Sequence, residues 1–527
     1  MAFKPPIRDN ALASFLKSFA TVGSNTMLSR VLGFVRDLVL ARMFGADAAT
    51  DAFFVAFKIP NFLRRLFAEG AFSLAFVPVL TEIRTQRSFA ELRTFVDRMA
   101  GTLGFVLLLT TLIGVVAAPV LILLFAPGFI GEDEDKYRLA VEMLHLTFPY
   151  LFFISLTAFA GSILNAHNRF GVPAFTPVLL NLTLIGCALW LSPMLQQPVV
   201  ALAWGVLIAG AVQFLFQIPF LHRINLLPRP RVAFKDKGIV RVMRLMVPAL
   251  FGVSVSQLNL LLDTLIASFL VSGSISWLYY SDRLLEFPVG ILGVALGTVI
   301  LPNLSRKHAE QSPEAFSDTL DWALRLMVLL GIPSALGLML LAGPMLTTLF
   351  YSAAFTAEDV AMATRSLMAY APGLLGILLI KVLAPGFYAR QNTKTPVKIG
   401  IIAMVTNMLF NIMLVFPLQH AGLALATSIS SALNAYLLYR GLRKTGVYRP
   451  GANWLWLGWR VALAAGVMSG LLILGTGDSS AWLQMGNGGR IGSLCLLIFA
   501  AIGVYFGLLF LTGLRLRHFR SRVRHAD

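Results

Sequence analysis

The sequence predicts an all-α integral membrane protein with about fourteen transmembrane helices, and three observations support this fold class. Of its 527 residues, 57% are hydrophobic and only 13% are charged, and the mean hydropathy is +0.78. Apolar stretches of about 20 residues, each long enough to cross a hydrocarbon core of roughly 30 Å as a helix, recur along the chain. The loops between them alternate in charge. Such a chain has too much apolar surface for a water-soluble core and needs lipid as its solvent.

Charged residues, glycines and prolines delimit the predicted helices. The first nineteen residues are basic but have no compact apolar core followed by a small-residue cleavage site, so we expect a retained cytoplasmic leader. Cys187 and Cys495 lie inside apolar runs and predict no disulfide. We place the helices near residues 20–44, 51–80, 99–126, 137–166, 173–193, 198–221, 240–271, 274–304, 320–350, 360–389, 396–417, 421–440, 456–476 and 490–514.

Basic residues gather in every second loop. Arginines occupy the loop after the second predicted helix, whereas the acidic segment 131–135 follows the third, and this alternation continues to the arginine-rich C-terminus. By the positive-inside rule, both termini lie in the cytoplasm. The net charge of +18 therefore reflects orientation in the membrane, and we expect no nucleic-acid binding.

A weak internal repeat divides the predicted helices into two lobes. Residues 51–58 resemble residues 276–283 at an offset of 225, and Asn168 and Asn392 lie in similar segments at an offset of 224. We therefore predict an N-lobe over 1–230 and a C-lobe over 231–450, each of six helices, followed by two further helices and a basic cytoplasmic tail over 451–527. Two parallel repeats are typical of transporters with alternating access.

Several charged residues fall inside predicted membrane helices. A central arginine costs about 2.5 to 3.5 kcal/mol on insertion scales, so several of them indicate a hydrated cavity lined by protein. Arginine also presents a planar fork that suits two phosphate oxygens. The charged residues are Arg30, Arg36 and Asp37 in the first helix, Lys58, Arg64, Arg65 and Glu69 in the second, and Asp282, Arg283 and Glu286 in the eighth.

Ion pairing within a helix is the alternative interpretation for two of these arginines. Arg65 and Glu69 are spaced i,i+4, and Arg283 and Glu286 are spaced i,i+3, so each pair can close on one helix face. Arg30, Arg36 and Arg64 have no acid at such a spacing, although Asp37 follows Arg36 directly. These three arginines are the better candidates for an anionic ligand.

Polar side chains on three other helices form a candidate cation site. Oxygen ligands from several helices could hold a small hard cation such as Na+, but hydrogen bonding between helices is the interpretation we favour. The sequence contains no GxSxG, P-loop or HExxH motif, so we predict no catalytic residues and no enzyme activity. The candidate cation ligands are Asp263, Asn407, Asn411 and Thr427.

Long strings around the intramembrane charges resemble one family. They are SRVLGFVRD (29–37), GADAATDAFFVAFKIPNFLRRLFAEGAFSLAFVPVL (45–80), SWLYYSDRLLEFPVGILGVALGT (276–298) and KVLAPGFYARQNTKTPVKI (381–399). The sequence is similar to the MurJ (MviN) lipid II flippases of the multidrug/oligosaccharidyl-lipid/polysaccharide exporter superfamily. The resemblance implies fourteen helices, a cationic cavity between two lobes, and a groove near the last two helices for a polyprenyl tail.

The resemblance also implies roles for individual residues. Essential cavity arginines correspond to Arg30, Arg36, Arg64 and Arg283, important acids to Asp51 and Glu286, and a small polar position to Ser276. A sodium site in some members corresponds to Asp263, Asn407, Asn411 and Thr427. This chain has Asn411 where an acid is expected, so sodium coupling stays open.

The function implied is that of a flippase that moves lipid II, the peptidoglycan precursor, from the cytoplasmic to the periplasmic leaflet. Export of another lipid-linked oligosaccharide or of an amphipathic small molecule is an alternative. A membrane-embedded glycosyltransferase is another, but such enzymes need carboxylates at an aqueous face. The expected partners are lipid II and membrane lipids, a role beside wall-synthesis proteins stays open, and a monomer is expected. Such a protein serves cell-wall formation and cell shape.

Overall fold

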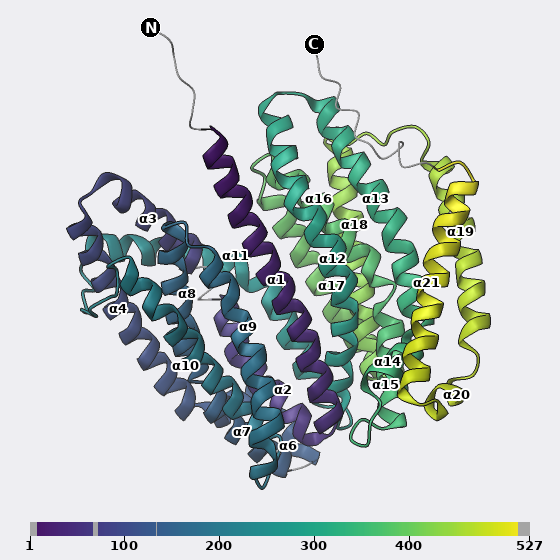
Figure 1. The fold of residues 1–527 in the computed structure, drawn as a ribbon, viewed down its shortest axis with the longest axis horizontal. Coiled ribbons are helices and arrows are strands. Elements are labelled where there is room, and N and C mark those ends of the chain that lie inside the picture. Colours follow the sequence, from purple (N-terminus) through teal and green to yellow (C-terminus); the bar gives the residue numbers. More distant parts are fainter. Residues whose placement is uncertain (1–7, 67–71, 133, 515–527) are drawn as a thin grey trace. The chain divides into compact units, whose positions relative to one another are not determined.

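The computed structural model describes residues 8–66, 72–132 and 134–514 (Figure 1). These residues form helices joined by short connections and contain no β-strand, which confirms the all-α fold class. Glu69, the N-terminal end and the basic C-terminal tail lie outside the described residues. Internal contacts divide the chain into two compact units, Met1–Ser272 and Gly273–Asp527.

The first unit contains eleven labelled α-helices within its described residues. Within it, α1 packs on α9, α2 packs on α7, and α10 packs on α8 and α9. The helices are α1 (Arg8–Phe44), α2 (Ala48–Leu63), α3 (Ser73–Gln86), α4 (Phe89–Val116), α5 (Ala118–Phe125), α6 (Phe129–Glu132), α7 (Glu134–Thr147), α8 (Tyr150–Ala166), α9 (Gly171–Gly186), α10 (Val200–Arg223) and α11 (Lys237–Ala267).

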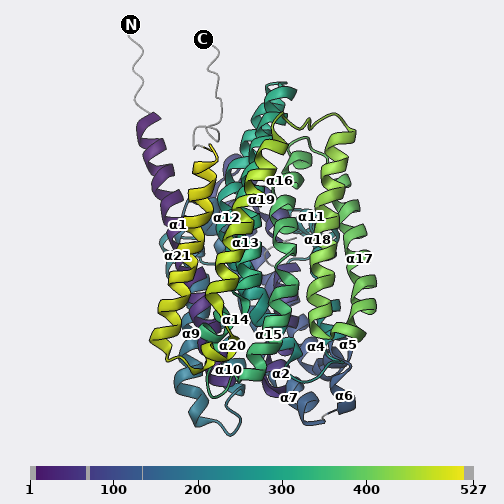
Figure 2. The same cartoon turned by 90° about the vertical axis from the view of Figure 1, so that its right-hand side faces the viewer.

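The second unit is built around α18, which packs on both α16 and α17. Helices α19 and α21 run side by side, and α19 also packs on α13 (Figures 1 and 2). The helices are α12 (Ser274–Ala309), α13 (Pro313–Leu340), α14 (Ala342–Phe350), α15 (Ala357–Tyr370), α16 (Gly373–Tyr388), α17 (Lys394–Leu418), α18 (His420–Lys444), α19 (Trp454–Thr476), α20 (Ser479–Gln484) and α21 (Asn487–Leu511).

Nine helices of the described chain are long and apolar enough to cross a membrane, and ten if α15 and α16, bent by 42°, form one span. The predicted helices outside this set are those near 20–44, 51–80, 240–271 and 274–304. The charges on α1 and α12 lower their hydropathy, and the segment 51–80 forms two shorter helices, α2 and α3. The predicted anion-binding residues all lie on these less apolar segments. The predicted number of fourteen spans stays a prediction.

The two compact units divide the chain at other positions than the predicted lobes. Helix α11 packs on α3, α4 and α5 and therefore belongs to the first unit, whereas the sequence placed it in a lobe that begins at residue 231. Helices α19 and α21 belong to the second unit through the contacts of α19 with α13. Sequence similarity locates a repeat but not the partner on which a helix packs, and the three-part division stays a prediction.

Helix boundaries show the internal repeat directly. Helices α4 and α13 begin at Phe89 and Pro313, and α5 and α14 begin at Ala118 and Ala342, so both pairs have the offset that separates Asn168 from Asn392. The starts of α7 and α15, and of α8 and α16, differ from this offset by a single position. The packing of α10 on α8 and α9 recurs as the packing of α18 on α16 and α17. The repeat predicted from short sequence matches is thus a repeat of helices and of their packing.

A buried aspartate on α4 holds the segment that follows α10, the sixth helix of the first repeat. Asp97 is 8% exposed, and its carboxylate accepts a 2.7 Å hydrogen bond from the backbone N–H of Arg229. The carbonyl of Asp97 accepts from the N–H of Arg231 at 3.0 Å. A buried carboxylate is costly unless hydrogen bonds satisfy it, so this contact defines the path of the chain.

The second unit has a buried aspartate with similar contacts at the equivalent position of the repeat. Asp321 on α13 is 7% exposed and accepts hydrogen bonds from the Tyr448 hydroxyl at 2.7 Å and from the Trp454 indole N–H at 2.8 Å. The N–H of Gly451 donates to the same carboxylate at 3.2 Å, and Arg325 Nε lies 2.7 Å from its other oxygen. We call Asp321 with these four partners the aspartate clasp. It holds the segment between α18 and α19 against α13.

Candidate functional site

Arg36 is a buried arginine neutralised by its neighbour in the sequence. Its Nη2 lies 2.6 Å from Asp37 Oδ1, and the two residues are 8% and 2% exposed. Its Nη1 donates to Asn181 Oδ1 at 3.1 Å, and Asn181 in turn donates to the carbonyl of Ser29 at 3.0 Å. Asn181 lies on α9, so this network joins α9 to α1. Sequence reasoning missed Asn181, which carries no charge and lies in an apolar stretch.

The other two predicted arginines of the first unit are more accessible. Arg30 on α1 is exposed, and no side-chain hydrogen bond or ion pair of Arg30 is found among the described residues. Arg64, directly after α2, is half-buried, and its Nε and Nη2 donate to Asn61 Oδ1 at 2.9 and 2.7 Å. The guanidinium of Arg30 therefore has its donors available for an anion.

Asp51 is paired with a lysine that sequence reasoning did not identify. Asp51 lies in the first turn of α2 and Lys136 on α7, and their Oδ2 and Nζ atoms are 3.2 Å apart. Their side chains are 1% and 5% exposed. Lys136 Nζ also donates to the Ser272 hydroxyl at 3.2 Å and lies 4.4 Å from the centre of the Phe129 ring. Because Lys136 directly follows the acidic segment 131–135, the sequence suggested a solvated loop there.

We expect Lys136→Met to destabilise the protein, because it removes one partner of a buried ion pair. Breaking such a pair costs about 3 kcal/mol or more, whereas replacing both partners costs far less. Thermal unfolding of the detergent-solubilised chain measures the effect. Arg138→Met on the same helix is the control, since that side chain is 78% exposed. Equal stability losses for the two single variants, or no recovery in Asp51→Asn with Lys136→Met, would contradict this expectation.

On α12 the predicted residues of the second unit take two different positions. Arg283 Nη1 lies 2.6 Å from Glu286 Oε2, and the guanidinium lies 4.8 Å from the centre of the Tyr279 ring. This confirms the i,i+3 pairing considered as an alternative from the sequence. The two side chains remain 30% and 51% exposed, so the pair is accessible to a ligand. Ser276 is fully buried near the start of the same helix.

The candidate cation ligands of the second unit bond to one another. Asn411 Nδ2 donates to Asn407 Oδ1 at 3.0 Å, and Asn407 Nδ2 donates to Thr427 Oγ1 at 3.3 Å. These bonds link α17 to α18, as the hydrogen-bonding interpretation predicted. Asp263 lies on α11 of the first unit. The two hydrogen bonds engage Asn407 Oδ1 and Thr427 Oγ1, and Na+ binding stays a prediction.

Comparison with known proteins decides the family. The family model described as "Lipid II flippase MurJ" matches residues 40–485. A Vibrio cholerae protein named "Probable lipid II flippase MurJ" is 51% identical over 512 residues, which cover 96% of this chain and 98% of the relative. The chain belongs to the lipid II flippase MurJ family. A Burkholderia cenocepacia protein named "Lipid II flippase MurJ" is 43% identical over 518 residues, covering 97% of this chain and all of the relative.

Solved structures agree with membership of the MurJ family. The chain is similar to "Lipid II flippase MurJ, inward closed conformation" with a TM-score of 0.77 and 27% identity, over 93% of this chain and 99% of that one. An inward-facing multidrug resistance MATE family transporter of the MOP superfamily matches with a TM-score of 0.68 at 14% identity, over 81% of this chain and 98% of that one, which shows the shared fold alone. The chain is a multi-pass membrane transporter, as predicted.

Proposed function

We propose that this chain is a flippase that moves lipid II from the cytoplasmic to the periplasmic leaflet of a bacterial inner membrane. The observation that carries the proposal is membership of the MurJ family over nearly the whole chain. The predicted substrate contacts support it, since Arg30 has an available guanidinium and Arg283 is partly exposed. Guanidinium groups at low local dielectric bind diphosphate through charge-assisted hydrogen bonds.

The proposed cycle uses the arginines to bind the diphosphate while the polyprenyl chain remains in lipid. Arg30, Arg36, Arg64 and Arg283 would contact the diphosphate, with Asp51, Ser276 and Glu286 positioning the lobes and the head group. Arg36 and Arg283 are paired with Asp37 and Glu286, so a diphosphate must compete with these acids for them. Because these acids can displace the diphosphate from the two arginines, the diphosphate can be released on the opposite side of the membrane.

The proposal also includes orientation and oligomeric state. Basic residues in alternate loops support cytoplasmic termini. The internal repeat supports a monomer, because one chain supplies both halves of an alternating-access transporter. Lipid II and membrane lipids are then the only partners that transport requires, and contacts with wall-synthesis proteins would be additional.

Reconstitution tests the proposed function. Purified chain is placed in liposomes that contain lipid II with a fluorophore on its head group, and a membrane-impermeant reductant is added outside. We expect the protected inner-leaflet fluorescence to fall with time in liposomes that contain the protein and to persist in protein-free liposomes. A fluorescent phosphatidylcholine should remain protected. If the protein binds labelled lipid II but the protected fluorescence does not fall, the chain does not act as a flippase on its own.

A further inference from the structure

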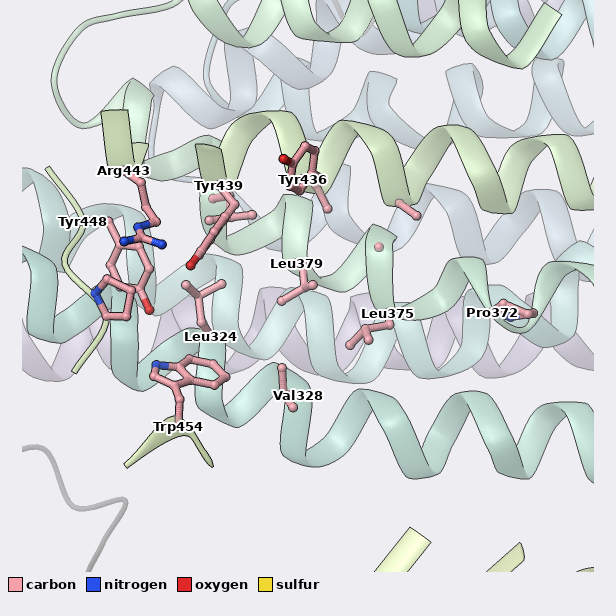
Figure 3. Close-up of a pocket in the computed structure, with 15 residues that line it drawn as sticks. Leu324, Val328, Pro372, Leu375, Leu379, Tyr436, Tyr439, Arg443, Tyr448 and Trp454 are labelled. Carbon is pink, nitrogen blue, oxygen red and sulfur yellow. The ribbon is translucent and has the colours of Figure 1, made fainter. Parts of the chain in front are cut away.

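A cavity of about 770 Å³ lies inside the second unit (Figure 3). Helices α13, α16 and α18 form its walls, and the segment from Tyr448 to Trp454 contributes to one end. Its volume falls in the range of about 300–1,000 Å³ that is typical of sites for small ligands. Arg30, Arg36, Arg64, Arg283 and the candidate cation ligands do not line it.

The lining of the cavity changes along its length. Val328, Leu375 and Leu379 form an apolar channel, whereas Arg443, Tyr439, Tyr448 and Trp454 gather with Leu324 at the other end, as Figure 3 shows. The aromatic residues at this end carry polar groups, a combination found where membrane proteins meet the lipid head groups. The cavity therefore suits a ligand with one polar end and one apolar end.

Positive charge is available at the polar end. Arg443 is exposed, its guanidinium lies 5.9 Å from the centre of the Tyr439 ring, and no carboxylate forms an ion pair with it among the described residues. Arg325, near the same end, is instead neutralised by Asp321 in the aspartate clasp. Arg443 is thus the lining cation that can bind an anion with its full charge.

The shape of the cavity is fixed before any ligand arrives. Tyr448 and Trp454 both donate to Asp321, so the aspartate clasp holds two walls of the polar end in place. Pro372 and Leu383 both line the cavity and are eleven residues apart, which corresponds to about 16 Å along α16. Half the hydrocarbon core of a bilayer measures about 15 Å, close to this length.

The channel is also accessible from one side. Ala432 and Tyr436 line the cavity from one face of α18, and both are exposed at the surface. Their spacing of four residues places them one turn apart on the same helix face. A chain-like ligand can therefore enter sideways from the membrane without passing through the helix bundle.

We propose that this cavity binds an anionic phospholipid of the surrounding membrane, with its phosphate at Arg443 and one acyl chain along Val328, Leu379 and Leu375. The charge at Arg443, the apolar channel, its length and its lateral opening all match such a lipid. The site is separate from the proposed lipid II contacts, and its test does not involve lipid II.

Photo-crosslinking tests the proposal on the full chain. The protein is placed in phosphatidylcholine nanodiscs that contain phosphatidylglycerol with a diazirine on one acyl chain, and crosslinked residues are mapped by mass spectrometry. We expect crosslinks on the cavity-facing residues of α13 and α16. Arg443→Gln should lower their yield about 10-fold, the effect expected from loss of one charge-assisted contact. Val328→Trp, which fills the channel, should abolish them.

The controls separate this site from general contact with lipid. Arg440→Gln removes an exposed arginine three residues away that does not line the cavity, and it should leave the yield unchanged. An absence of crosslinks in the cavity, equal losses for the two arginine variants, or equal labelling by a diazirine phosphatidylcholine would overturn the proposal. Competition by inorganic phosphate would also overturn it, because the site would then bind the free anion. The comparison of diazirine phosphatidylglycerol with diazirine phosphatidylcholine uses the unaltered protein. It therefore tests the proposal even if a variant fails to fold.

Discussion

Cells whose only flippase carries Arg30→Ala are expected to stop growing, although the variant is made in normal amounts. Arg30 is exposed, and no ion pair holds it among the described residues, so its loss should change the free energy of unfolding by no more than about 0.5 kcal/mol. Transport should suffer far more. A hydrogen bond to a charged group contributes about 1.5–3 kcal/mol, which corresponds to a roughly 10- to 100-fold lower rate.

Depletion of the native protein, with plating efficiency and immunoblotting of the variant, measures this effect. Cells with Arg283→Ala should also stop growing although the variant is made in normal amounts. The substitution should cost little stability, because Glu286 is 51% exposed and stays solvated without its partner. Arg306 lies on the same helix as Arg283, and its side chain is 64% exposed. Arg306→Ala is therefore the control and should support normal growth. Full growth with both Arg30→Ala and Arg283→Ala would remove the arginines from the proposed substrate site.

Asp321→Ala is expected to lower the free energy of unfolding by about 3 kcal/mol or more. The substitution removes the acceptor for the Tyr448 hydroxyl, the Trp454 indole and the Gly451 N–H, and each buried donor left without a partner costs about 1–3 kcal/mol. It also removes the carboxylate that pairs with Arg325. Burial and the hydrogen bond to Asp321 raise the pKa of Tyr448 above its usual value, so the hydroxyl is a donor at every physiological pH.

Thermal unfolding in detergent distinguishes the aspartate clasp from a general effect of charge on α13. Asp318→Ala is the control, because Asp318 lies one turn earlier on α13 and is exposed. Asp321→Asn should give an intermediate loss, since an amide oxygen can still accept hydrogen bonds but carries no charge for Arg325. If Asp318→Ala and Asp321→Ala unfold at the same temperature, the clasp contributes nothing to stability.

The features that the sequence predicted correctly depend on local spacing. Apolar runs determine the helices, and the matching segments around Asn168 and Asn392 indicated the repeat that the helix boundaries confirm. The pairing of Arg283 with Glu286 could be considered in advance because i,i+3 residues share a helix face. Periodicity and composition also located the charged helices on which the candidate site depends.

The features that the sequence did not reveal depend on contacts between distant segments. Lys136 follows an acidic segment and resembles a solvated residue, and only the packing of α7 on α2 places its ammonium beside Asp51. Asn181 and Asp97 are similar, since their partners are 145 and 132 residues away. A single sequence records which residues are polar, but the partner of each polar group follows from the packed structure.

The position of α11 has a consequence for dividing this protein into fragments. By its place in the repeat, α11 corresponds to α1 and begins the second repeat, yet it packs on α3, α4 and α5 of the first repeat. A gene cut at the repeat boundary, within residues 224–236, would encode an N-terminal polypeptide that lacks a helix covering its own apolar surface. A cut at Ser272 and Gly273 keeps that helix with its neighbours, and Gly273, with its φ of 96°, already marks a turn in the chain there. Two co-expressed fragments should therefore reassemble more readily from the second cut.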